Sequence, residues 1–220
     1  KKERGTDYDR TWSIYLKNID ETVFTNLGES YNPYSYIYTM SSDDLVYEGT
    51  FRTSNDWVTF DIKPFEYDGR NLLVTVVQNS GIGGADQFWR YTTNTDYSTN
   101  QCLAKYAEKE LDVTQKLNWN MFAGRFDIQL TIAAEEGGGE EPEPTPEPEQ
   151  PGNDLIVTVG SGSEVEAFVP FNTSYDNTIS QQIYLAEDFQ GKTGKIKSYA
   201  FKCAIELSSY GTPITVKRNF

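Results

Sequence analysis

One segment of the chain cannot belong to a folded core. Residues 135–151 read EEGGGEEPEPTPEPEQP and contain no valine, isoleucine, leucine or aromatic residue. A segment of this composition has too little apolar surface to offset the entropy lost on ordering. Its alternating prolines and like charges favour an extended, solvated chain. We therefore predict an acidic Pro/Glu/Gly linker over residues 135–152, which divides the chain into residues 1–134 and residues 153–220.

The charge and the missing histidine exclude several classes of function. The formal net charge is −14, whereas phosphate binding needs a basic surface, so we expect no nucleic-acid partner. The chain has no histidine, which removes Ser-His-Asp and Cys-His catalysis and most zinc, copper and iron sites. No apolar run approaches the length of a transmembrane helix, so we expect no membrane insertion.

Apolar and polar residues alternate in many short segments, as in half-buried β-strands. DWVTFDIK (56–63) predicts Val58, Phe60 and Ile62 on the inner face and Trp57, Thr59 and Asp61 on the outer face. TWSIYLKNI (11–19) and GRFDIQLTIA (124–133) alternate in the same way, whereas NLLVTVVQ (71–78) is nearly all apolar and predicts a central strand. After the linker, DLIVTV (154–159) and KIKSYAFKCAIEL (195–207) predict strands, and SQQIYLA (180–186) predicts a strand or strand-like edge.

Together these patterns predict an all-β protein with little or no helix. Short strands in this number, without an amphipathic helix pattern, are typical of a two-sheet antiparallel β-sandwich of jelly-roll type.

Several segments resemble a β-sandwich repeat that occurs in tandem in secreted and surface proteins of bacteria. VTVGSG (157–162), SQQIYLAEDF (180–189) and GKIKSYAFKC (194–203) resemble the early third of that repeat. IYLKN (14–18), LVYEGTF (45–51), WVTFDIKPFEYDGRNLLVTVVQNSG (57–81) and the strand at 124–133 resemble its late two-thirds. The resemblance is to cleaved-adhesin modules of the gingipain haemagglutinin type. It implies a bacterial adhesin-like module, repeated in the parent chain, whose signal peptide lies upstream.

The order of these segments predicts how the chain closes. Residues 1–134 correspond to the late two-thirds of one module and residues 153–220 to the early third of the next. Each part alone would expose unpaired strand edges and half a core. We therefore expect residues 153–220 to fold back onto residues 1–134 and to complete one sandwich, whether the chain is a window on a tandem array or a circular permutant.

Aromatic residues in loops, or opposite the apolar stripe of a strand, are the first candidates for ligand binding. Exposed tryptophan and tyrosine rings stack on sugars and anchor protein partners, although they also plug the rims of sandwiches. The cluster at Asp86, Trp89 and Arg90 lies beside the glycine-rich loop NSGIGGAD (79–86). The full candidate set is Trp57, Tyr67, Asp86, Trp89, Arg90, Tyr91 and Trp119.

Oxygen-bearing side chains in the loops make a bound calcium ion an alternative. The candidate ligands are Asn79, Asp86, Asp96 and Asn100, although their spacing matches no known calcium loop. No other cofactor is expected. Two cysteines, Cys102 and Cys203, are too few for a disulfide scaffold, but if the two parts of the chain fold together a single disulfide between them is an alternative.

These features favour a non-catalytic module of the cell surface or extracellular space that binds a glycan or a host or matrix protein. The alternative is an accessory domain of a secreted peptidase or glycoside hydrolase without a ligand of its own. A carboxylate-based glycosidase is the third reading, because carboxylates are the main acid–base groups left in a chain without histidine. The acids that lie in or near strands are Glu48, Asp61, Glu66, Asp68, Asp86 and Asp127. Most acids on outward strand faces and turns are expected to be merely solvated.

Overall fold

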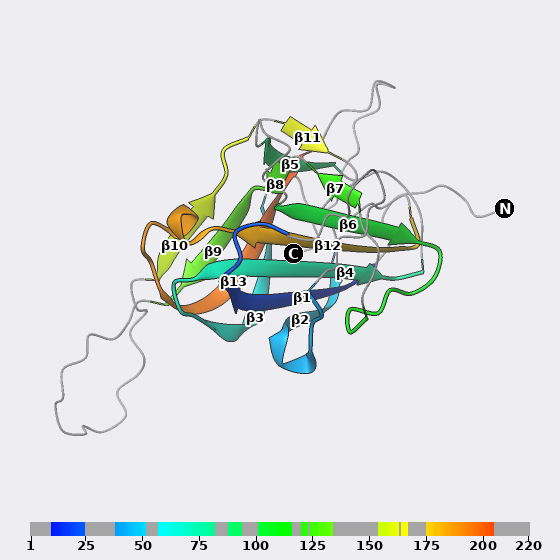
Figure 1. The fold of residues 1–220 in the computed structure, drawn as a ribbon, viewed down its shortest axis with the longest axis horizontal. Coiled ribbons are helices and arrows are strands. Elements are labelled where there is room, and N and C mark those ends of the chain that lie inside the picture. Colours follow the sequence, from blue (N-terminus) through cyan, green and yellow to red (C-terminus); the bar gives the residue numbers. More distant parts are fainter. Residues whose placement is uncertain are drawn as a thin grey trace, which may run out of the picture.

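The computed structural model of the chain (Figure 1) is a β-sandwich of two antiparallel sheets. It describes residues 10–24, 38–51, 57–81, 88–93, 101–115, 120–122, 124–133, 154–162, 164–166 and 175–204. Over these residues the helices are short 3-10 turns, and none is long and apolar enough to cross a membrane. The predicted all-β, two-sheet antiparallel sandwich is confirmed, whereas its jelly-roll connectivity stays a prediction. The linker lies outside the described residues.

The first sheet has six strands, and its central pair combines strands from both sides of the linker. The order is β2 (Leu45–Phe51), β1 (Arg10–Ile19), β4 (Asn71–Asn79), β12 (Asn177–Tyr184), β6 (Cys102–Ala107) and β7 (Asn120–Phe122). β4 pairs with β1 on one edge and with β12 on the other. The prediction that residues 71–78 form a central strand is therefore confirmed.

The second sheet is organised around a strand from the end of the described chain. Its path is β10 (Leu155–Val159), β9 (Ile128–Ile132), β13 (Gly194–Ala204), β5 (Phe88–Thr93) and β11 (Glu164–Glu166). Two further strands join it: β3 (Trp57–Tyr67) pairs with β13, and β8 (Gly124–Phe126) pairs with β5. Two 3-10 turns complete the described elements, η1 (Ser42–Asp44) and η3 (Ala186–Phe189).

The main core lies between the two sheets and follows the alternation of the sequence. Val58, Phe60 and Ile62 are buried, whereas Thr59 and Asp61 on the other face of β3 are exposed. The inward residues of β1 and of 124–133 are also buried, as predicted. From beyond the linker, the core takes Tyr184, Phe189, Ile196, Tyr199 and Phe201, all of them fully buried.

A second hydrophobic cluster covers the outer face of the six-stranded sheet. It is built from residues on β4, β6 and β12 and from loop residues that cover them. The loop residues include Phe24, Met40 and Leu111, and Met40 N donates to Val113 O at 3.0 Å. This third layer explains why β4 is apolar on both faces, because each face meets a separate cluster.

For residues 180–186 the strand alternative is confirmed and the edge alternative is not, because β12 lies inside its sheet. All eight of its residues are buried, although Gln181 and Gln182 are among them. On the outer face, Gln181 Nε2 donates to Tyr38 O at 2.7 Å, and Tyr38 N donates to Gln181 Oε1 at 3.1 Å. On the inner face, Phe126 N donates to Gln182 Oε1 at 3.1 Å. Gln181 is thus bonded at both ends of its amide, whereas Gln182 is bonded at Oε1 and its buried Nε2 finds no partner among the described residues.

Candidate functional site

A recess of about 380 Å³ opens where β8, the end of β10 and η3 meet. Figure 1 shows η3 beside the end of β10, and these two elements are in contact. The polar lining of the recess comes from Thr92, Arg125, Thr158, Ser161 and Asp188. The volume falls within the range of small-ligand sites, and the lining combines residues from both sides of the linker.

A paired arginine and aspartate form the charged wall of the recess. Arg125 donates two hydrogen bonds to Asp188, from Nη1 to Oδ2 and from Nη2 to Oδ1, the second at 3.1 Å. Each of the two side chains is 16% exposed. Leu185 N also donates to Asp188 Oδ2, at 2.8 Å, so the first turn of η3 holds the carboxylate in place. Such a bidentate pair fixes the two groups relative to each other, and the guanidinium keeps further N–H donors that Asp188 does not use.

A buried tyrosine supports the guanidinium from below. Arg125 Cζ lies 5.7 Å from the ring centroid of Tyr184, within cation–π range. Burial raises the pKa of Tyr184 well above its usual range, and the nearby guanidinium opposes this only in part. The phenol oxygen lies 2.6 Å from Gln182 Oε1 and 3.0 Å from Phe126 O, and donates to one of them. Arg125 therefore rests on a neutral, fixed ring.

The opposite wall is held by a hydrogen-bonded chain around Asp127. Thr92 Oγ1 donates to Asp127 Oδ1 at 2.9 Å and accepts from Ser161 N at 3.1 Å and Gly162 N at 3.0 Å. Asp127 is 1% exposed and separates β8 from β9. Asp127 is therefore an exception to the expectation that most such acids are solvated, because the chain switches partner strands here and turns the side chain under Gly160.

Gly160 is packed against Asp127 in this wall, and the space there admits no larger residue. Its φ is +92°, and a Cβ atom built on it would lie 2.2 Å from Asp127 Oδ1. The glycine in VTVGSG is therefore required both by its backbone conformation and by the close approach of the carboxylate.

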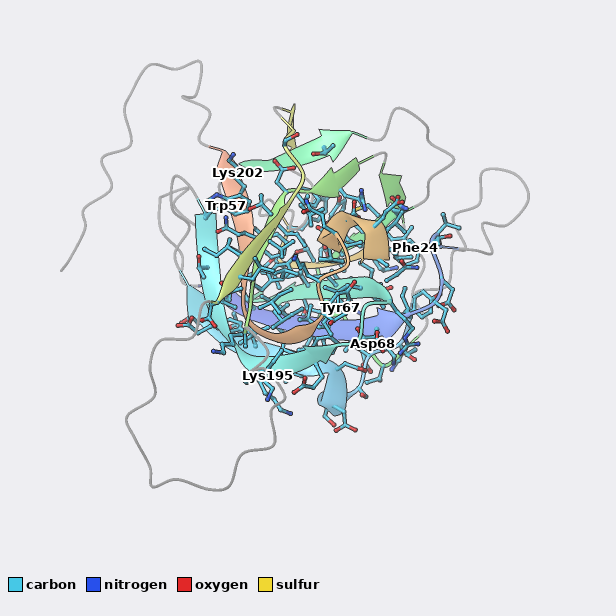
Figure 2. The ribbon with its side chains drawn as sticks, turned by 90° about the vertical axis from the view of Figure 1, so that its left-hand side faces the viewer. Phe24, Trp57, Tyr67, Asp68, Lys195 and Lys202 are labelled. Carbon is cyan, nitrogen blue, oxygen red and sulfur yellow. The ribbon has the colours of Figure 1, made fainter. Side chains whose placement is uncertain are left out.

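Of the aromatic residues predicted to bind ligand, the structure places two side chains. Trp57 is half-buried at the start of β3, and Lys202 Nζ lies 5.6 Å from its ring centroid; the two residues are side by side in Figure 2. Tyr67 is 2% exposed, donates from its hydroxyl to Arg70 O at 2.6 Å and meets the Phe189 ring. Tyr67 is therefore a core residue, and its prediction as an exposed platform is wrong.

The other predicted ligand-binding residues are not tested. Trp89, Arg90 and Tyr91 lie on β5, but their side chains fall outside the described residues, as do Asp86 and Trp119 entirely. The sequence analysis missed Arg125 and Asp188, which bear no aromatic ring and lie on opposite sides of the linker.

Of the predicted calcium ligands, the structure describes the side chain of Asn79. Asn79 donates from Nδ2 to Leu111 O at 3.1 Å and accepts at Oδ1 from Leu111 N at 3.2 Å. Both ends of its side-chain amide therefore bond the backbone of Leu111, and its role as a calcium ligand stays a prediction. Asp96 and Asn100 lie outside the described residues, within which no group of three or more acidic or cysteine side chains could hold a metal ion.

Cys102 is a free thiol in the core, so the alternative of a disulfide with Cys203 is not realised. Burial raises the pKa of the Cys102 thiol, which keeps it protonated and unreactive. The geometry thus identifies a β-sandwich with a polar recess where β8, β10 and η3 meet. No protein-family model, curated protein or solved structure matches the chain.

Proposed function

We propose that the chain is a non-catalytic binding module of an extracellular or cell-surface bacterial protein, and that it takes a glycan at the recess. The observation that carries the proposal is the Arg125–Asp188 pair in the recess wall. Each sugar hydroxyl both donates and accepts, so neighbouring hydroxyls match a guanidinium and a carboxylate held side by side. Both groups are fixed before ligand arrives, which lowers the entropy lost on binding.

The arrangement of carboxylates favours binding over catalysis. A glycosidase places two carboxylates about 5–10 Å apart across the scissile bond. Of the carboxylates around the recess, Asp188 is held by Arg125, and Asp127 lies beneath Gly160 and accepts from Thr92. Neither stands free to protonate a leaving group or to attack a sugar.

The resemblance to cleaved-adhesin modules and the acidic linker support a place in a repetitive chain. Weak sites repeated along one polypeptide gain avidity through their high effective concentration. A host or matrix protein is the alternative partner, for which Trp57 on an outer sheet face is the candidate contact.

One observation favours an accessory domain without a ligand. The Arg125–Asp188 pair links β8 to η3 and so joins segments from the two sides of the linker. A purely structural ion pair would have the same geometry, and only a binding experiment separates the two readings.

The test is a glycan array followed by NMR titration with the best monosaccharide or disaccharide. We expect Asp188→Asn and Arg125→Lys to weaken binding at least about tenfold, because each removes a charge-assisted or bidentate contact. The matched control is Arg70→Lys, since Arg70 pairs with Asp68 away from the recess, with Nε and Nη2 both close to Asp68 Oδ2. Absence of any glycan ligand supports the accessory domain, and equal binding by all variants would place the site elsewhere.

A further inference from the structure

The two sides of the linker contribute to the sheets in an unusual pattern. We call the described strands of residues 10–133 the acceptor segment and those of residues 154–204 the donor segment. β12 lies between β4 and β6, and β13 lies between β3 on one edge and β9 and β5 on the other. Figure 1 shows the same interleaving, with the orange strands β12 and β13 set among blue and green neighbours. The donor segment therefore supplies the central strand of both sheets.

The donor strands depend entirely on the acceptor for their pairing. β10 pairs with β9, β11 pairs with β5, and within the described residues no two donor strands pair with each other. Removal of the donor would leave β4, β6, β3, β9 and β5 with open edges, and would take Tyr199 and Phe201 out of the core. Neither segment can form this sandwich alone.

The strand pairing between the segments does not require a short covalent connection. Ile132 of β9 pairs directly with Leu155 of β10. A two-residue turn would join such neighbours, yet residues 133–154 lie between them. Strand pairing and core packing thus hold the two segments against each other.

We infer that the acceptor surface can take its donor segment from a second copy of the chain, by strand donation in trans. Main-chain hydrogen bonds along β12 and β13 give the affinity, and the buried side chains of the donor give the specificity. In an intact chain the linker keeps its own donor at roughly millimolar effective concentration, so the chain closes on itself. Once the linker is cut, donors are exchangeable between copies.

The test uses the whole chain with a specific protease site placed within residues 137–148. After cleavage we expect the two parts to coelute at the size of the intact protein, with an unchanged amide NMR spectrum. Unfolding of the cut protein by urea should become dependent on protein concentration, as for any complex. When isotope-labelled and unlabelled cut proteins are mixed, native mass spectrometry should detect hybrids of one labelled and one unlabelled part.

Two variants distinguish strand donation from incidental sticking. Phe201→Ala in the cut protein should raise the dissociation constant of the two parts about 100-fold or more, because Phe201 is fully buried. Ile156→Ala is the control and should change it less than about threefold, since Ile156 is 61% exposed. Separation of the parts at micromolar concentration, a folded acceptor segment without its donor, or equal effects of the two variants would overturn the inference.

Discussion

Gly160→Ala tests whether the wall of the recess depends on the buried carboxylate beneath it. The added Cβ would lie 2.2 Å from Asp127 Oδ1, 2.9 Å from its Cγ and 3.1 Å from its Cα. The Cα belongs to the backbone at the junction of β8 and β9, so rotation of the Asp127 side chain cannot relieve every contact. The side chain would have to move away from Thr92, which holds both Ser161 N and Gly162 N.

The magnitude is the sum of a backbone effect and a contact effect. A residue other than glycine at positive φ costs about 1–2 kcal/mol. Breaking the Thr92–Asp127 bond inside the protein costs about a further 1–3 kcal/mol, so we expect about 2–5 kcal/mol in all. Gly191→Ala is the matched control, because Gly191 has φ +73° and nothing within 4 Å of its Cβ position. It should cost only the backbone effect, about 1–2 kcal/mol.

Urea unfolding followed by tryptophan fluorescence and circular dichroism measures both variants. A double-mutant cycle with Asp127→Ala separates the contact effect, since Gly160→Ala should then cost no more than Gly191→Ala does. Equal free energies for Gly160→Ala and Gly191→Ala in the natural background would refute the reasoning, because the close approach to Asp127 would then have no energetic weight.

Two other predictions concern the faces of β10 and the buried phenols. Val157→Thr should lower the free energy of unfolding by about 1–3 kcal/mol because it buries a hydroxyl. Ile156→Thr, on the exposed face of the strand, should change it by no more than about 0.5 kcal/mol. Urea unfolding compares the two variants, and reversed effects would show a different register. Burial raises the pKa of Tyr67 to about 12 and places those of Tyr184 and Tyr199 well above the usual 10.0. A raised folded-state pKa stabilises the protein fully below the unfolded value, so stability should begin to fall above pH 10.0 and continue to fall as pH approaches the folded-state values. Tyrosinate absorbance and circular dichroism should change together at high pH, and early ionisation of all tyrosines in a folded protein would contradict the burial.

The sequence predicts best those strands in which one face meets solvent, together with β4, whose nearly continuous apolar run indicates burial on both faces. β3 is the clearest example, since Val58 and Phe60 are buried and Thr59 between them is exposed. The period of two then reports burial directly. At Asp127 the same rule fails, because the strand breaks there and the side chain enters the wall of the recess instead of solvent.

The alternation rule also fails for β12, where both faces are buried and the residues are largely polar. Gln181 lies under the third layer, where it bonds Tyr38 and also donates to Thr75 Oγ1 at 3.0 Å. Gln182 faces the main core and bonds Phe126 N. The low hydrophobicity of residues 180–186 therefore leaves an edge position open, whereas the strand occupies the middle of the sheet. The sequence of β12 alone does not reveal that the loop residues around Tyr38 fold over it.

The recess escaped prediction for a related reason, since its charged pair forms only when distant parts of the chain meet. Arg125 precedes the linker and Asp188 follows it, and neither has a neighbour in sequence that indicates a site. The same junction places Thr92 against Ser161. If donor and acceptor segments exchange between copies, the recess is rebuilt with each exchange, because both of its walls require the two segments together. Ligand binding at the recess would then strengthen the association of the segments, by the linkage that joins any ligand to the state it prefers. A glycan that binds the recess should accordingly slow the appearance of hybrids in the mixed, cut protein. Unchanged exchange at saturating glycan would mean that the recess and the donor interface are energetically independent.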